Sequence, residues 1–190
     1  MSSGWRGRLI HWTFHNNRWD DVRLKGHTHS IFCLSKVSEN QFLTNDYNGN
    51  NYIWTFESTE GWNEISQQRM ETTHGNYQKT CIIDEESFAM INRWGMISYF
   101  QSNHSKYSKI IDFTATTGIG YDILFKSPYI IGMTEFQLLL INHESLEIKS
   151  ISVENGRQIL LLEDQIYVLT RSGIYKTHEN CSITDEGQEI

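Results

Sequence analysis

The chain carries the stretch Ser2-Ser3-Gly4-Trp5-Arg6-Gly7-Arg8-Leu9-Ile10-His11-Trp12-Thr13-Phe14, which aligns without a gap on Thr44-Asn45-Asp46-Tyr47-Asn48-Gly49-Asn50-Asn51-Tyr52-Ile53-Trp54-Thr55-Phe56. In both stretches a glycine stands five residues before a tryptophan, and a threonine and a phenylalanine follow. Trp12 and Trp54 are 42 residues apart. A period of about 40–45 residues is typical of repeats that consist of four short β-strands. The sequence therefore predicts a series of four-stranded β units.

The second of these stretches belongs to the most complete unit. Before this stretch, apolar and polar residues alternate over 30–37. An alternation with a period of two residues is typical of a half-buried strand. The Asn48-Gly49 pair is typical of a tight hairpin turn between two strands. The four strands of this unit are expected at 30–37, 41–44, 51–56 and 62–65.

The same pattern continues along the chain with less fidelity. Phe100 takes the tryptophan position 46 residues after Trp54, Ile141 takes it 41 residues later, and His178 takes it 37 residues after that. The apolar spacing is about 2 rather than 3.6 residues and the runs are short, so we expect almost no helix. Further strands are expected at 76–83, 87–92, 96–100, 120–125, 129–133, 137–141, 158–162, 165–169 and 173–176.

Gly26-His27, the Asn48-Gly49 turn and Trp54-Thr55 together resemble one blade of the WD-repeat β-propeller family. The resemblance implies that the Gly-His pair opens the innermost strand and that the tryptophan ends the third. It also implies a buried hydrogen-bond network with a hydroxyl on the second strand and an acid in the hairpin. Asn48 takes the acid's place and Thr55 the terminal aspartate's, two departures from the family pattern. The network residues expected from the resemblance are His27, Thr44, Asn48 and Trp54, with Trp12 as the equivalent tryptophan one blade earlier.

The predicted fold is all-β, a partial WD-repeat-like β-propeller in one domain of four-stranded antiparallel blades. Residues 1–25 are expected to form the second half of a blade, 26–74, 75–115 and 116–153 a blade each, and 154–190 a last, degenerate blade. Such an array leaves open flanks. Another chain or segment completes it, or it closes as a ring of four or five blades, or it stays open, held by a partner or by self-association. The apolar opening residues are no polar cap, which favours an obligate partner.

Composition narrows the classes of partner. The net charge of −7 and the isoelectric point near 5.6 give no electrostatic footprint for nucleic acid or for an acidic membrane. No apolar run approaches the ~18–20 residues that span a bilayer. Cys33, Cys81 and Cys181 are widely spaced, so a disulfide or zinc framework is not expected. We expect a soluble cytoplasmic protein.

No sequence pattern supports catalysis or a cofactor. The chain has no Gly-x-Ser-x-Gly, no Gly-rich phosphate loop and no His-Glu-x-x-His. His27 and His29 are two residues apart, but no third ligand with suitable spacing follows. We therefore expect no enzyme, no cofactor and no metal.

The expected hairpin tips between second and third strands are rich in aromatic and arginine residues, which are enriched at interface hot spots. The simplest explanation is that each ring packs on a neighbouring loop, and the alternative is a protein-binding rim. The candidate rim residues are Trp5, Arg6, Tyr47, Arg93, Trp94, Phe136 and Arg171. The leading functional hypothesis is a non-enzymatic scaffold or recognition subunit of an intracellular complex, in which a protein partner completes the propeller. The alternative is a regulatory propeller that controls an enzyme on a partner chain or upstream segment.

Overall fold

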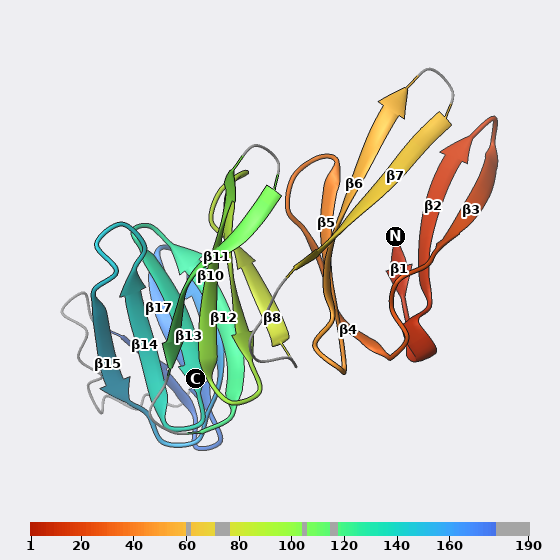
Figure 1. Ribbon diagram of the computed structural model, residues 1–190. Helices are drawn as coiled ribbons and strands as arrows, with labels where there is room; N and C mark the ends of the chain where they lie inside the picture. The colour runs from red at the N-terminus through yellow and green to blue at the C-terminus, as the bar shows by residue number, and fades with distance from the viewer. Residues whose placement is uncertain (60–61, 71–76, 104–105, 115–117, 178–190) are drawn as a thin grey trace. The chain divides into compact units, whose positions relative to one another are not determined.

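The computed structural model describes residues 1–59, 62–70, 77–103, 106–114 and 118–177 (Figure 1). Within these residues the chain forms eighteen β-strands, a single 3₁₀ turn at Trp5–Gly7 and no α-helix. The all-β prediction is therefore confirmed. His178 and Cys181 lie outside the described residues.

Backbone contacts divide the chain into two compact units. The first unit consists of Met1–Tyr77 and Ser102–Ser108, and the second of Gln78–Gln101 and Lys109–Ile190. The sequence predicts one domain, whereas the backbone contacts group the chain into two units. The predicted blade boundaries stay predictions. Tyr107 connects Ser102–Ser108 to the rest of the first unit. Its hydroxyl donates to Gln41 (3.2 Å) and its carbonyl accepts from Gln68 (2.8 Å).

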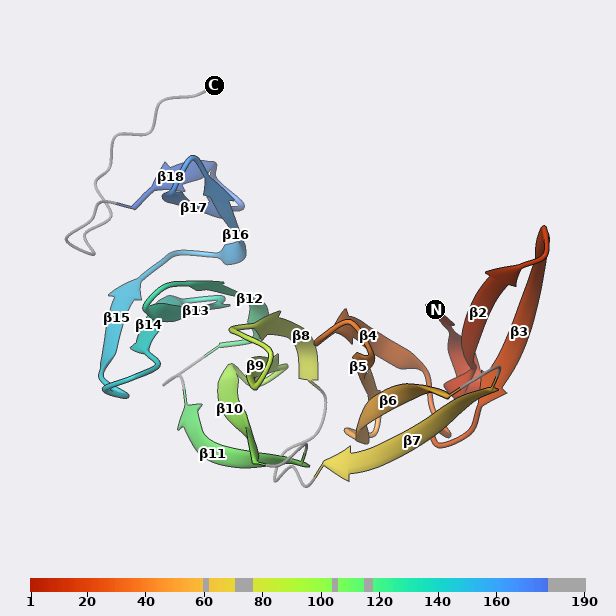
Figure 2. The ribbon, with the colours of Figure 1, turned by 90° about the horizontal axis from the view of Figure 1, so that it is seen from above.

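Every sheet is an antiparallel meander in which strands consecutive in sequence are neighbours. In the first unit, a three-stranded and a four-stranded sheet follow each other (Figures 1 and 2). Asn16 and Asn17 have φ of 49° and 57° in the turn from β2 to β3, a conformation that asparagine tolerates better than most residues. The strands are β1 (Ser2–Ser3), β2 (Leu9–His15) and β3 (Arg18–Leu24), then β4 (Ile31–Lys36), β5 (Gln41–Asp46), β6 (Asn51–Thr59) and β7 (Trp62–Met70).

Three more sheets follow, and most of their strands lie where the alternation predicts them. The sheets are β8 (Tyr77–Ile82), β9 (Ser87–Asn92), β10 (Met96–Asn103) and β11 (Lys106–Thr114); β12 (Gly120–Lys126), β13 (Tyr129–Thr134), β14 (Gln137–Asn142) and β15 (Ile148–Ser152); and β16 (Gly156–Leu162), β17 (Gln165–Thr170) and β18 (Ile174–Lys176). The alternation does not predict β11 or β15. Both are outer strands with many exposed side chains, so their apolar pattern is weak.

A β-bulge recurs near the start of the first strand in three sheets. The strand register shifts between Ile31 and Cys33, between Gly120 and Asp122, and between Gly156 and Gln158. A bulge leaves one residue unpaired and redirects its side chain. The bulged residues are Phe32, Tyr121 and Arg157.

The cores lie between successive sheets. Leu9 and Leu24 of the β1–β3 sheet pack with Ile31, Tyr52 and Trp54 of the β4–β7 sheet. In the second unit, residues of β8–β11 pack with Ile123, Ile130, Leu139 and Ile141, while the other face of the β12–β15 sheet packs with Ile159 and Val168. The β12–β15 sheet, which lies between two other sheets of the second unit, therefore has two apolar faces.

Trp54, Phe100 and Ile141 occupy the same place in their sheets. Each is buried on the third strand and is paired across the ladder with an apolar residue of the second strand: Phe42, Phe88 and Ile130, respectively. Phe100 also stacks on Phe88, with ring centroids 5.1 Å apart. The assignment of Phe100 and Ile141 to the tryptophan position thus agrees with the register of the strands.

Gly120 provides a test of the close approach between two sheets. A Cβ at this position would lie 2.2 Å from the carbonyl oxygen of Asn92 and 2.9 Å from Ile91. Because the first obstacle is backbone, we expect Gly120→Ala to lower the free energy of unfolding by about 1–3 kcal/mol. Urea denaturation would measure the change. Gly4→Ala is the control, since a Cβ at that position would meet nothing within 4 Å; equal effects of the two substitutions would contradict this packing.

Candidate functional site

A chain of buried hydrogen bonds runs through the β4–β7 sheet. Trp54 Nε1 donates to Thr44 Oγ1 (2.7 Å), which lies 2.6 Å from His27 Nε2, and His27 Nδ1 lies 3.0 Å from Asp46 Oδ2. The side chains of His27 and Asp46 are fully buried. The proton positions that satisfy every atom place the Thr44 hydroxyl as donor to Nε2 of a neutral His27 and His27 Nδ1–H as donor to Asp46.

The acid of this network is Asp46, and the assignment of Asn48 to that place is wrong. Asn48 is exposed on the hairpin tip, where its side-chain nitrogen lies 3.2 Å from His29 Nε2. Asp46 ends β5 two residues after Thr44, so both side chains point to the same face of the strand. That spacing of two residues is the sequence signal for the acid, and it lies at the strand end rather than in the loop.

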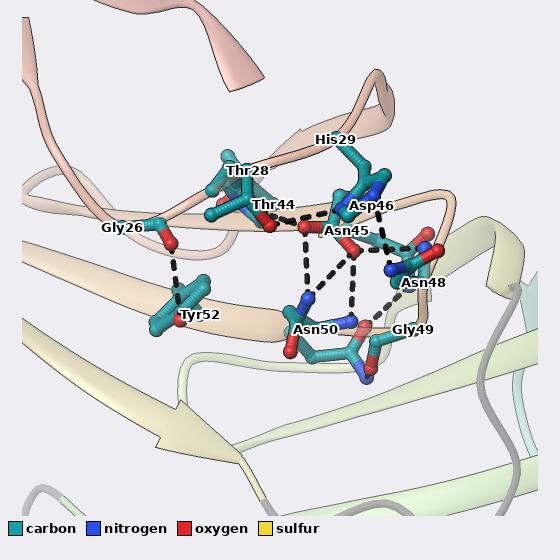
Figure 3. A network of polar contacts seen from close by, with 12 residues as sticks. Gly26, Thr28, His29, Thr44, Asn45, Asp46, Asn48, Gly49, Asn50 and Tyr52 are labelled. Atoms are coloured by element: carbon teal, nitrogen blue, oxygen red, sulfur yellow. Dashed lines mark hydrogen bonds and ion pairs between the residues drawn. The ribbon is translucent and has the colours of Figure 1, made fainter. Parts of the chain in front are cut away.

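Asp46 also caps the hairpin that follows it (Figure 3). Its Oδ1 accepts hydrogen bonds from the backbone N–H groups of Asn48 and Asn50, both at 3.0 Å. The side-chain amide of Asn50 donates to both carboxylate oxygens, at 3.1 and 3.0 Å. One carboxylate thus joins the buried network to the exposed tip.

The electrostatics of the pair follow from these contacts. Burial lowers the pKa of His27 below its usual value, although the neighbouring Asp46 opposes the shift. Burial alone would raise the pKa of Asp46, but the hydrogen bonds from His27 and Asn50 outweigh it and hold that pKa below its usual value. Both shifts favour a neutral histidine beside an ionised carboxylate.

Three other hairpin tips have the same kind of cap. Asn92 Oδ1 accepts from the backbone N–H groups of Trp94 and Met96, at 3.0 and 2.9 Å. Thr134 Oγ1 accepts from Gln137 (3.0 Å), and Thr170 Oγ1 accepts from Ser172 (3.1 Å). Each capping residue is buried and is the last residue of the second strand of its sheet. The tips are therefore held from within the sheets.

Backbone hydrogen bonds connect the tips to the strand that follows each sheet. Ile31 N donates to Gly4 O (3.3 Å), Gly120 N to Arg93 O (3.1 Å) and Gly156 N to Glu135 O (2.9 Å). The tips that contain Arg93 and Glu135 are therefore held both by their own caps and by the next sheet.

In the first unit, the candidate rim residues are solvent-exposed. Trp5 has 87% of its surface exposed, and Arg6 and Tyr47 are also exposed. The structure adds Phe32, whose exposed ring meets that of Tyr47 edge-on with centroids 5.6 Å apart. Phe32 is a bulge residue, and a bulge has no clear signature in one sequence.

In the second unit, Arg93, Trp94, Phe136 and Arg171 are exposed on their tips. The structure adds two bulge residues beside them: the guanidinium of Arg157 lies 4.4 Å from the centre of the Tyr121 ring, and its Nη2 lies 3.8 Å from Glu135. Trp12, expected in the buried network, instead donates to Ser2 Oγ (2.9 Å) and is exposed.

A second buried carboxylate joins three first strands of the second unit. Asp122 accepts from Lys79 Nζ on β8 (2.8 Å) and from the backbone N–H of Ile159 on β16 (2.9 Å). Among the described residues, no group of three or more histidine, cysteine or acidic side chains is placed to hold a metal ion. Within the same residues, no helix has the length and apolarity that crossing a bilayer requires.

The comparisons with known proteins agree with this architecture. The chain is similar to the WD40 β-propeller domain of Doa1, with a TM-score of 0.66 and 14% sequence identity over 95% of this chain and 61% of that one. It is also similar to a putative 6-phosphogluconolactonase from Bacteroides uniformis, with a TM-score of 0.64 and 12% identity over 85% of this chain and 55% of that one. No protein-family model and no curated protein sequence matches. The fold is that of a partial β-propeller, and the chain spans less than two thirds of either structure.

The hydrogen-bond chain is tested by a matched pair of tryptophan substitutions. Trp54→Phe keeps a ring but removes the donor to buried Thr44, so we expect it to lower the free energy of unfolding by about 1–2 kcal/mol. Trp54→Ala also removes the buried ring and should cost about 3–5 kcal/mol. Trp12→Phe removes an exposed donor and should cost less than about 0.5 kcal/mol. Urea denaturation that ranks Trp12→Phe with Trp54→Phe would contradict the network.

The pH dependence of stability is a second test. His27 has a lowered pKa when folded, so the unfolded state binds more protons and stability falls as pH drops below about 6.5. Asp46 has a lowered pKa, so its contribution is present above about pH 4 and is lost as pH falls further. His11 contributes with the same sign as His27, because burial lowers its pKa. In urea denaturation across pH, His27→Gln should flatten the slope between about pH 5 and 6.5; an unchanged slope would be inconsistent with a buried neutral His27.

Proposed function

We propose that this chain is a non-enzymatic protein-interaction module, acting as a scaffold or recognition subunit of an intracellular assembly. The observation that carries the proposal is the set of exposed aromatic and arginine side chains on tips that are held by side-chain caps or by backbone hydrogen bonds. The held backbone of these tips has little conformational freedom to lose on binding, and Trp, Tyr and Arg are enriched at binding hot spots. The similarity to a WD40 propeller supports an interaction domain at the level of the fold.

The buried polar groups support a structural rather than a catalytic use. His27 and Asp46 hold a hydrogen-bond chain and a hairpin, and Asp122 holds three strands together. Cys81 is buried, which raises the pKa of its thiol to about 12 and makes it a poor nucleophile. Each of these groups is committed to packing or to a hydrogen bond within the fold.

We further propose that additional polypeptide completes the array of sheets. The chain spans 61% and 55% of the two propellers to which it is similar. Unpaired sheet faces expose apolar surface to water, which favours association. The completing polypeptide would bury that surface, while the rim would remain available for a protein ligand.

The test compares affinity capture from cell extract by variants of the rim, followed by mass spectrometry. We expect Trp5→Ala/Tyr47→Ala or Arg93→Ala/Trp94→Ala to lose partners that the wild-type chain retains, while far-UV circular dichroism stays unchanged. Ile110→Ala/Ile148→Ala is the control, since it removes exposed apolar side chains from the outer strands β11 and β15. Partner capture that survives both rim variants would rule out this surface.

A further inference from the structure

Two sheets in the described chain have a largely apolar face whose side chains are exposed or half-buried. We call the first the leading face: Ile10, Trp12 and Phe14 of β2 with Trp19 of β3. Phe14 and Trp19 are a cross-strand pair whose rings lie 5.0 Å apart. The second is the trailing face of the β16–β18 sheet: Leu160, Leu162, Tyr167, Leu169 and Ile174. Its residues share a face because Leu160 pairs with Tyr167 and Leu169 pairs with Ile174.

The leading face has the same type of surface as a face that is buried elsewhere in the chain. Trp12 aligns with Trp54, and Trp54 packs against Leu9 and Leu24 of the preceding sheet. Trp54 is 3% exposed, whereas Trp12 is 40% exposed. The residues two positions after these tryptophans show the same contrast. Phe56 packs on His11 with ring centroids 4.4 Å apart, whereas its equivalent Phe14 is exposed.

The trailing face corresponds to the opposite kind of surface, the face of a sheet that packs on the sheet that follows it. The capping residues Thr134 and Thr170 are equivalent, so Met133 corresponds to Leu169 and Ile131 to Tyr167. Leu138, which pairs with Met133, then corresponds to Ile174. Ile131, Met133 and Leu138 are buried against the following sheet, in contact with Ile159 and Val168. Leu138 is 0% exposed and Ile174 is 41% exposed.

We propose that a second copy of this chain covers these faces in a head-to-tail contact, with the leading face of one copy on the trailing face of the next. Sheet stacking in this molecule joins a face of the leading type to a face of the trailing type. The chain carries one uncovered face of each type, so contact between copies continues an interface that each copy already contains. A heterologous contact of this kind forms a ring if its rotation closes and a filament if it does not.

The inference rests on the proposal that further polypeptide completes the array, and it identifies that polypeptide as the same sequence. A partner that covers both faces must itself present one face of each type, and a second copy of this chain does so. The trailing face has no described acidic residue among its members, and Lys176, which pairs with Tyr167, lies on the same face. Aromatic rings such as Trp12 and Phe14 pack well on aliphatic chains and on a lysine.

Sedimentation velocity of the purified chain over a dilution series tests the contact. We expect the wild-type chain to form species larger than the monomer that dissociate on dilution. Phe14→Glu/Trp19→Glu blocks the leading face and Leu162→Glu/Ile174→Glu blocks the trailing face; all four side chains are exposed, so both variants should fold. Each variant alone should associate on the order of 100-fold more weakly, because a carboxylate without a partner enters an apolar contact.

Mixing the two variants gives the decisive result. Each retains the face that the other lacks, so the mixture should form a 1:1 complex that neither variant forms alone. A monomeric wild-type chain, as expected if it closes on itself or needs blades of another protein, would overturn the proposal. So would self-association of either blocked variant, which would indicate a face-to-face dimer, or a mixture that stays monomeric.

Trp5→Glu/Trp94→Glu is the matched control, because it places the same charges on exposed aromatic positions of the rim. It should leave the sedimentation profile unchanged, and an equal loss of association would overturn the assignment to the two faces. The two proposals fail separately. Loss of partner capture in rim variants with a monomeric wild-type chain would retain the interaction module and reject the head-to-tail contact.

Discussion

The stacking of one sheet on the next is the constraint on which this molecule depends. A sheet in the middle of such a stack has two apolar faces, so a neighbour on each side must exclude water from it. The requirement explains why the same places in successive sheets hold Trp54, Phe100 and Ile141. It also explains two glycines of the second unit: a Cβ would lie 2.2 Å from the backbone oxygen of Asn92 at Gly120 and 2.7 Å from that of Thr134 at Gly156.

The polar groups complement this packing. A buried strand end would leave the N–H groups of the following turn without partners, and a capping oxygen from Asp46, Asn92, Thr134 or Thr170 satisfies them. The capped turns after β5 and β9 carry the exposed side chains Tyr47 and Trp94.

The sequence predicts the all-β class and most strand positions, because alternation and Asn-Gly turns are local signals. Ser87–Asn92 lies where the pattern places it. Outer strands such as β15 are not predicted, because most of their side chains are exposed to solvent and need not alternate between apolar and polar. The motif does not predict the role of Asp46, because that role depends on Asp46 and Thr44 lying on the same face of β5. Arg157 and Tyr121 meet through two bulges on different sheets, a long-range contact that no local pattern encodes.

Asp46 has two structural roles with a single carboxylate, since one oxygen meets His27 and the other holds the hairpin that presents Tyr47. A molecule that bound the Tyr47 hairpin and distorted it would therefore also change the contact between Asp46 and the His27 imidazole. By thermodynamic reciprocity, protonation of the imidazole would alter affinity at the loop by the same factor that occupancy of the loop alters proton uptake. Any binding at this loop would thus be linked to protonation of His27.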